Sequence, residues 1–180
     1  MYATIEHLKE AELHLPMLLR EPELWNTLDV DYYPPRVERL WTQYDNDHRL
    51  YIHLIHPTNE PCLFHKHRWP ASFKMIDGSY EMGITHCIDE IDSEEAYKLP
   101  TMAKFILNTG SYYQMTETNT LHYVKPLGGI STSLMLAGPL YPEAEFRKEA
   151  VDRELKSLSD FRKMTILQWM QKLYTYHFYA

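Results

Sequence analysis

The chain has 180 residues, of which 44% are hydrophobic and 24% charged, which is enough for one domain with a sizeable core. Its formal net charge of −7, with no basic cluster to offset it, argues against nucleic acid as the main partner, because phosphate binding needs a basic face. No apolar stretch approaches about 18 residues, and the N-terminal residues lack the pattern of a secretory signal. We therefore expect a cytoplasmic protein that does not enter a membrane. In that setting the two cysteines, Cys62 and Cys87, are expected to be free thiols.

Residues 1–34 are predicted to form a helical segment. Apolar residues recur at helical spacing at Leu8, Ala11, Leu15 and Leu18. Pro16 interrupts this pattern, so we expect one short helix, a bend, and a second helical turn over residues 22–28. The pair Pro34 and Pro35 closes the segment.

Residues 36–138 are predicted to form many short strands. The turn residues Asp45 to Asp47 separate two β-rich runs, residues 36–44 and 49–56, which indicates a hairpin. Further strands are expected over residues 62–67, 72–77, 79–87, 104–108, 112–116, 121–125 and 131–136. The acidic residues 89–95 interrupt them as a loop or short helical turn. Short strands joined by regular turns favour a barrel or a sandwich.

Residues 142–175 are predicted to be helical. Pro142 suits a helix start, and the acidic residues that follow it favour the positive end of the helix dipole. An apolar stripe continues at Leu155, Leu158, Phe161, Ile166, Trp169 and Leu173, with a possible break over residues 157–160. The aromatic tail, residues 174–180, is expected to dock on the barrel or on a second subunit.

The pair His65 and His67 is the main candidate for chemistry. Residues i and i+2 of a strand point to the same face, so two imidazoles there can form half of a metal site. With 10 histidines in the chain, such a pair arises by chance roughly half the time, so its context must support it. His122 is the best candidate for a third ligand. Imidazole suits iron, zinc, copper and nickel, and three protein ligands leave positions open for catalysis.

The sequence around these histidines resembles the cupin superfamily. The His-x-His pair and the step from His67 to Gly78 resemble the first cupin motif, although Ala71 stands where a glutamate is usual. The run from Gly110 to His122 resembles the second motif, one residue longer and without its proline and inner glycine. The resemblance implies an all-β, cupin-type double-stranded β-helix barrel, or jelly roll, with helices at both ends, in a single domain over residues 1–180.

A cupin without that glutamate is most similar to the cysteine dioxygenase type of thiol dioxygenase, over about residues 36–139. This resemblance implies ferrous iron on His65, His67 and His122, with open positions for substrate and O₂; zinc, manganese or nickel are alternatives. The family's Ser-x-His-x-Tyr relay is missing, because only Ser133 remains and Met135 and Ala137 replace the other two residues. Arg39 stands near the family's carboxylate-binding arginine.

Several other polar residues could have either a catalytic or a structural role. The weak catalytic candidates are Tyr80, Glu81, Tyr123 and Ser133, of which Glu81 could replace the missing carboxylate. Tyr112 and Tyr113 could likewise supply an acidic hydroxyl near the metal, and Arg68 or Trp69 could line the mouth of the pocket. His86 is a weaker fourth ligand candidate. His53 and His56 lie three residues apart on opposite strand faces, and we expect both to be structural.

The leading hypothesis is therefore a mononuclear non-haem iron dioxygenase that acts on a small organic molecule chelating the metal. The alternatives are a small-molecule-binding cupin without turnover, and a zinc or manganese isomerase or hydrolase. A homodimer is expected, because cupins often form one and the aromatic tail is consistent with a contact between subunits.

Overall fold

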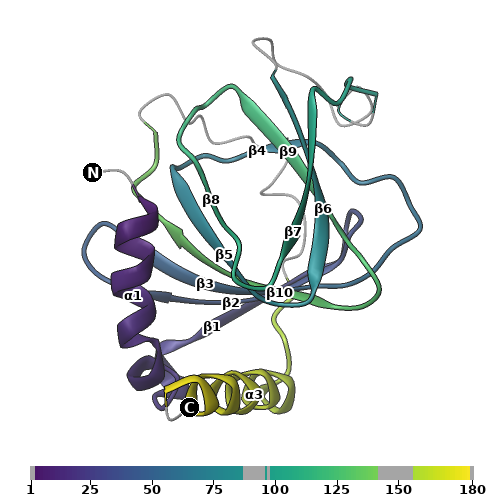
Figure 1. Cartoon of the computed structure of the whole chain (residues 1–180). Helices are drawn as coiled ribbons and strands as arrows, with labels where there is room; N and C mark the ends of the chain where they lie inside the picture. The colour runs from purple at the N-terminus through teal and green to yellow at the C-terminus, as the bar shows by residue number, and fades with distance from the viewer. Residues whose placement is uncertain (1–2, 87–95, 97, 142–155, 179–180) are drawn as a thin grey trace.

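A computed structural model describes residues 3–86, 96, 98–141 and 156–178, and the side chains of all of these except 176–178. Helices and strands follow one another as α1 (Ile5–Leu18), η1 (Pro22–Leu24), β1 (Asn26–Val30), β2 (Val37–Gln43), β3 (Arg49–Ile55), β4 (His65–Lys66), β5 (Ala71–Asp77), β6 (Ser79–His86), β7 (Ala103–Asn108), β8 (Tyr112–Met115), β9 (Thr120–Pro126), β10 (Ser131–Ala137) and α3 (Asp160–Phe178). Strands dominate the described residues (Figure 1).

The strands form two antiparallel sheets. One sheet has the order β1-β2-β3-β10-β5-β8, and the other has the order β4-β9-β6-β7. Strand β10 lies between β3 and β5, so distant parts of the chain alternate across the sheet (Figure 1). This crossed order is that of a jelly roll, which confirms the predicted cupin-type β-barrel.

Alternation along the strands separates an inner from an outer face. In β3, Leu50, Ile52 and Leu54 pack in the cluster that includes the helices, whereas Tyr51 and Ile55 belong to clusters on the other face. Strand β10 is buried at every position, because helices cover its outer face and the barrel interior covers its inner face. The barrel interior is therefore the place where polar side chains can form a secluded site.

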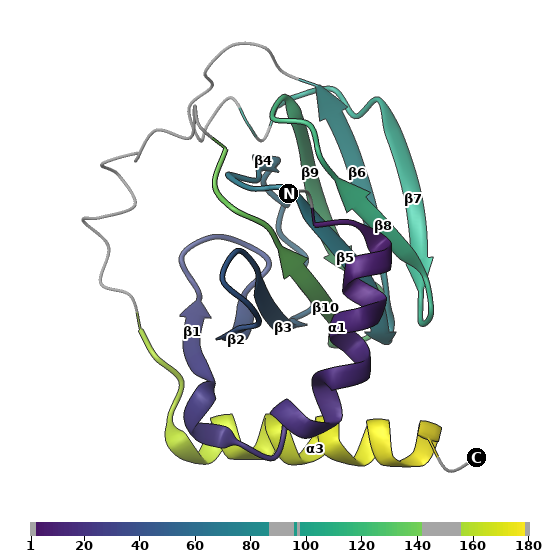
Figure 2. The same ribbon diagram turned by 90° about the vertical axis from the view of Figure 1, so that its left-hand side faces the viewer.

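Helices α1 and α3 lie against the six-stranded sheet (Figure 2). Leu8 and Leu15 from α1 pack with Ile166 and Met170 from α3 over the outer side of the sheet. Pro16 lies inside α1, which continues to Leu18, so the predicted break between two helical segments falls after Leu18 and before η1. Proline has no backbone N–H to donate to the preceding turn of a helix, and α1 ends within one turn after Pro16.

The prediction that residues 1–34 are helical fails after η1. Residues 26–30 form strand β1, which pairs with β2 as an edge strand of the sheet. Trp25, which is 2% exposed, anchors the change of direction by donating its indole N–H to the Leu18 carbonyl at 2.9 Å. The free edge of β2 supplies backbone partners that a second helix could not use, so tertiary pairing decides the structure.

Helix α3 begins at Asp160, at the end of the possible break that the sequence indicated over residues 157–160. Lys156 forms a β-bridge with Asp29, and α3 starts at Asp160 after Ser159, whose hydroxyl accepts the Arg162 N–H at 3.2 Å. The predicted helix over residues 142–155 lies outside the described residues, as do Cys87 and residues 89–95. Among the helices of the described ranges, none has the length and apolarity to cross a membrane.

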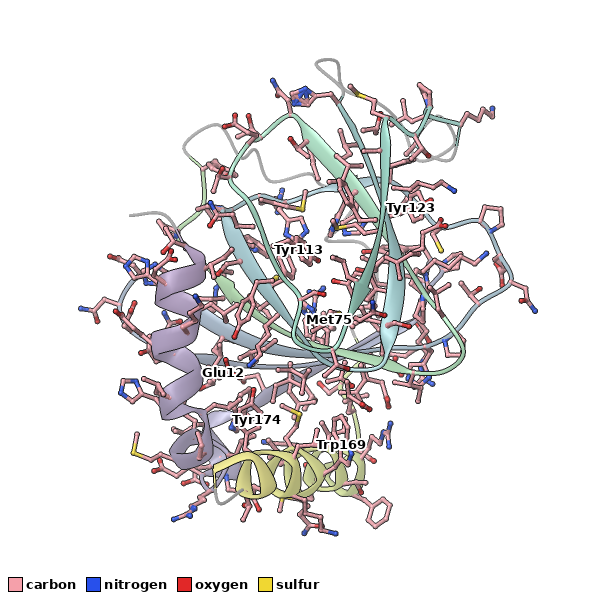
Figure 3. The ribbon with its side chains drawn as sticks, in the orientation of Figure 1. Glu12, Met75, Tyr113, Tyr123, Trp169 and Tyr174 are labelled. Atoms are coloured by element: carbon pink, nitrogen blue, oxygen red, sulfur yellow. The ribbon has the colours of Figure 1, made fainter. Side chains whose placement is uncertain are left out.

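The first part of the aromatic tail docks within the chain itself. Tyr174 is 7% exposed and donates its hydroxyl hydrogen to Glu12 of α1 at 2.8 Å (Figure 3). Lys74 of β5 and Tyr112 of β8 also donate to Glu12, at 2.5 and 3.2 Å. The two helices and the barrel therefore share one polar junction.

Candidate metal centre

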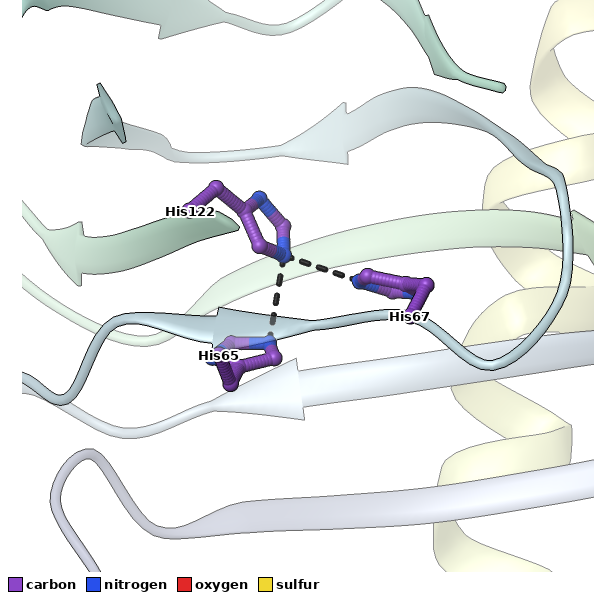
Figure 4. Close-up of side chains that lie close together, drawn as sticks. All are labelled: His65, His67 and His122. Carbon is purple, nitrogen blue, oxygen red and sulfur yellow. Dashed lines mark hydrogen bonds between the residues drawn. The ribbon is translucent and has the colours of Figure 1, made fainter. Parts of the chain in front are cut away.

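His65, His67 and His122 converge at one end of the barrel interior (Figure 4). The short strand β4 pairs with β9 so that His65 lies directly opposite His122, and His67 follows β4 immediately. The His122 Nε2 atom lies 3.1 Å from His65 Nε2 and 2.9 Å from His67 Nε2. Three ring nitrogens from two separate motifs therefore meet at one point.

The separations between these nitrogens suit a shared metal ion. Two nitrogens bound to one ion at about 2.1 Å lie roughly 3.0 Å apart at a right angle and roughly 3.4 Å apart at the tetrahedral angle. The observed separations of 2.9 and 3.1 Å are close to the first value. No carboxylate joins the group within the described ranges, and Ala71, where a glutamate is usual in cupins, is fully buried in an apolar cluster.

A hydrogen bond also favours the tautomer of His65 that can bind a metal through Nε2. The His65 Nδ1–H donates to the Leu63 carbonyl at 3.2 Å, which leaves Nε2 with its lone pair facing the other two rings. His122 Nδ1 is buried and has no partner among the described residues, so its ring is held by packing. Phe73, with its ring 5.4 Å from that of His67 and 6.1 Å from that of His122, supplies part of this packing.

Burial keeps the three imidazoles neutral. Burial lowers the pKa of His67 to about 3, and the neighbouring His65 and Arg39 add charge repulsion. Burial likewise lowers the pKa of His65, and it lowers the pKa of His122 well below its ordinary value. At neutral pH all three rings therefore carry free lone pairs, which is the form that binds a metal.

A cavity of about 80 Å³ opens beside the three histidines. Tyr80 and Tyr113 line it and share a hydrogen bond of 2.9 Å between their hydroxyl groups, and Tyr113 stacks on Phe73 with ring centroids 4.4 Å apart. Burial raises the pKa of both phenols, so both remain protonated at neutral pH. The cavity is thus lined mainly by aliphatic and aromatic side chains, with a smaller number of polar groups.

The weak candidates from the sequence divide into two groups. Tyr80 and Ser133 line the cavity. Glu81 and Tyr123 lie on the other face of their strands, where the Tyr123 hydroxyl donates to Glu81 at 2.6 Å and Lys104 pairs with the same carboxylate at 3.2 Å. The structure therefore does not bring Glu81 or Tyr123 to the histidines, and the exposed His86 contacts Thr120 instead.

His53 is the residue that the sequence reasoning missed. Its side chain is 7% exposed and lines the cavity, whereas His56 pairs with Glu38 outside it at 2.9 Å, as a structural role predicts. The signal was present in the alternation of β3: its outer positions are all apolar, so a histidine on the other face must lie inside the barrel. Arg39, directly opposite His53 on β2, lines the cavity too.

No protein-family model matches the sequence, and no curated protein shows significant similarity to it. Solved structures with a similar fold include the hydroxypropylphosphonic acid epoxidase from S. wedmorenis, at 18% identity and a TM-score of 0.46. That match covers 64% of this chain and 56% of the epoxidase chain, so this chain matches about half of the epoxidase's length.

Two further structures are similar over most of their own length. KdgF from Halomonas sp. matches at 15% identity and a TM-score of 0.44, covering 70% of this chain and 91% of that one. An RmlC-like cupin from Shewanella frigidimarina matches at 12% identity and a TM-score of 0.45, covering 67% and 89%. The fold and the site together define a cupin-type barrel with a three-histidine centre suited to a metal ion.

Proposed function

We propose that the protein is a metal-dependent cupin, a mononuclear non-haem iron dioxygenase whose small organic substrate chelates the metal. His65, His67 and His122 would hold the ion. The single observation that supports this most is the convergence of their three neutral Nε2 atoms beside a secluded cavity. Imidazole nitrogens suit iron, and three protein ligands would leave positions open on the ion for the substrate and O₂.

Each part of the site has a role in this proposal. A bound ion would supply a centre that orients and polarises the two reactants. The aromatic rings of Phe73 and Tyr113 exclude water from the cavity. The linked hydroxyl groups of Tyr80 and Tyr113 hold a phenolic proton at the cavity wall, where it can be donated to an oxygen atom of the substrate.

A second candidate is a cupin that binds a small molecule without turnover. It is favoured by strand β10, which contributes only Ser133 and Met135 to the lining of the cavity. No histidine–tyrosine relay can form along that strand. Oxidation of cysteine itself is therefore not part of the proposal.

The first test is the metal content of protein purified without an affinity tag. We expect near-stoichiometric iron in the parent and loss of the metal in His65→Ala and His122→Ala. His86→Ala is the matched control, because this exposed histidine lies outside the triad, and it should retain the metal. A parent protein that contains no metal and takes none up on reconstitution would refute the proposal and leave the binding barrel.

The second test separates the reactions. O₂ uptake across a panel of small acids, thiols and enols should depend on His65 and His122 if the protein is a dioxygenase. Stoichiometric zinc or manganese without O₂ uptake would instead favour an isomerase or a hydrolase. The homodimer stays a prediction, which light scattering at several concentrations would test.

A further inference from the structure

Three β-branched side chains form a row across one wall of the cavity. Val30 on β1 lies directly opposite Val37 on β2, and Val37 lies directly opposite Ile55 on β3. All three residues line the cavity. Side chains directly opposite each other in antiparallel strands point to the same face of the sheet, so the row is one continuous apolar surface.

Val124 adds a fourth apolar side chain from the other sheet. It lies on β9, lines the same cavity, and belongs to the hydrophobic cluster that contains Ile55 and against which Val37 packs. Pro34 and Pro35, from the connection between β1 and β2, line the cavity as well. None of these side chains has a hydrogen-bonding group. A polar group placed against them would therefore lose its contact with water without compensation.

The apolar row lies one strand repeat away from the polar part of the cavity. On β9, Val124 is two residues after the metal-ligand candidate His122, and on β3, Ile55 is two residues after His53. All four of these residues line the cavity. Side chains two residues apart on a strand point to the same face and lie roughly 6–7 Å apart. The cavity therefore has a polar level, which contains the metal ligands, and an apolar level next to it.

The size of the cavity limits an occupant that spans both levels. One water-sized group needs roughly 10–15 Å³ on this measure of volume, so a cavity of about 80 Å³ holds roughly six non-hydrogen atoms. An extended chain of about six atoms, joined by bonds of about 1.5 Å, spans a distance similar to that between the two levels. A small molecule with one polar end and one aliphatic end therefore fits, whereas a molecule that is polar at both ends would bury one end without partners.

We propose that Val30, Val37, Ile55 and Val124 form an apolar subsite beside the metal triad, and that this subsite takes a short aliphatic part of the substrate while the metal holds the chelating part. This inference rests on the proposed function, because the triad must hold the ion. It narrows the substrate class from small organic molecules to compact amphipathic ones, with a chelating head and a short aliphatic tail.

Hydroxamates test the tail, because they keep the chelating head constant. The head contains four non-hydrogen atoms, so roughly two carbons remain for the tail in a cavity of this size. Affinities would be measured by calorimetry on the metal-loaded protein without O₂, with retained metal checked after gel filtration because hydroxamates also chelate metals in solution. We expect propionohydroxamate to bind about fourfold more tightly than acetohydroxamate, the factor for one buried methylene. Hexanohydroxamate, whose tail exceeds the cavity, should bind more weakly than propionohydroxamate.

A second pair of probes changes only the polarity of the tail. Glycolohydroxamate has as many non-hydrogen atoms as propionohydroxamate, with a hydroxyl group in place of the terminal methyl group. We expect it to bind roughly tenfold more weakly, because the hydroxyl group loses its hydrogen bonds with water. Equal affinities for these two compounds would overturn the proposal.

Variants locate the subsite. Val37→Thr replaces a methyl group by a hydroxyl group of similar shape, so it should reduce the preference for propionohydroxamate over glycolohydroxamate and leave the metal content unchanged. Ile55→Val enlarges the cavity by one methyl group, so it should improve butyrohydroxamate relative to propionohydroxamate by about fourfold. Ile52→Val is the matched control, since Ile52 lies on the other face of β3, in the cluster that includes the helices, and does not line the cavity. It should keep the tail preference of the parent.

The two proposals fail in distinguishable ways. If the parent holds metal and neither Val37→Thr nor Ile55→Val changes the tail preference, the apolar subsite is wrong and the metal site stands. If the parent takes up no metal, the proposed function is wrong. Xenon, which binds in apolar cavities without a metal, then tests the subsite by methyl NMR of the metal-free protein. A shift of the Ile55 methyl signals under xenon, with those of Ile52 unchanged, would preserve the subsite, and no shift would refute it too.

Discussion

Arg162→Ala should measurably weaken the attachment of the C-terminal helix to the barrel. Arg162 of α3 donates from Nε and Nη2 to the two carboxylate oxygens of Glu38, at 2.8 and 2.5 Å, and His56 Nε2 lies 2.9 Å from the second oxygen. Glu38 is only 3% exposed, so its carboxylate depends on these partners for stabilisation. Glu38 precedes the cavity-lining Arg39 on β2, so the same contact helps to fix a strand of the cavity wall.

The burial of the ion pair sets the expected loss in the free energy of unfolding. Removing one partner of a fully buried ion pair costs about 3–5 kcal/mol. The Arg162 side chain is 36% exposed, and Glu38 would keep His56 and the more distant Arg36 at 3.8 Å, so we expect a loss of about 2 kcal/mol in the free energy of unfolding. In a chain of this length that corresponds to a melting temperature lower by roughly 4–8 °C. Urea unfolding followed by circular dichroism measures it.

The stabilisation by the Arg162–Glu38 pair should decrease in acid. Burial raises the pKa of Glu38, but the hydrogen bonds from Arg162 and His56 outweigh it, so the folded-state pKa lies below the ordinary value of 4.5. The contribution of the pair is thus complete above pH 4.5 and is lost as the pH falls through the folded-state pKa. The difference between parent and Arg162→Ala should therefore narrow in acid.

Lys163→Ala is the control for helix propensity, because it makes a similar change at the next position of α3. A loss below about 0.5 kcal/mol in Arg162→Ala, or a difference that does not change between pH 7 and pH 3, would refute the reasoning. Equal losses in the two variants would show that the effect belongs to the helix and not to the pair.

Two further predictions concern packing away from the metal centre. A Cβ at Gly83 would lie 2.1 Å from the Tyr123 ring, so Gly83→Ala should cost roughly 1–3 kcal/mol in urea unfolding; Gly129→Ala, where a Cβ meets nothing within 4 Å, is the control, and equal costs would contradict the prediction. Glu12→Gln removes the charge that Lys74 and Tyr174 contact, so it should cost about 2 kcal/mol in the same assay, and an unchanged transition midpoint would show that the junction contributes nothing.

The hairpin of β2 and β3 was predictable from its turn and from the apolar residues of β3. Leu50, Ile52 and Leu54 alternate along β3 and are all buried, and Asp45, whose carboxylate accepts the N–H groups of Asp47 and His48 at 2.8 Å, marks the turn between the two strands. Local chemistry and tertiary packing agree in these segments. Sequence patterns therefore located the barrel strands to within a few residues.

The errors occurred where a partner far away in the chain decides the outcome. Residues 26–30 have no strong pattern of their own, and they become a strand because the edge of β2 is free to pair. Lys156, which was predicted to be helical, instead forms a β-bridge with Asp29 and an ion pair with Asp31 at 3.0 Å. Neither partner can be recognised from the local sequence.

At the site, too, local patterns were recognised from the sequence and contacts between distant strands were not. The sequence singled out His65 and His67 because their spacing within one strand is a local pattern, and it singled out His122 through the resemblance of its surroundings to a cupin motif; the structure brings the three side chains together. His53 was missed because its place in the cavity lining becomes clear only once β3 lies between β2 and the distant β10, opposite Arg39 and Ser133. Spacing along one strand can thus indicate candidate metal ligands, whereas the other residues of the cavity lining are recognised only when strands from distant parts of the chain are placed in register.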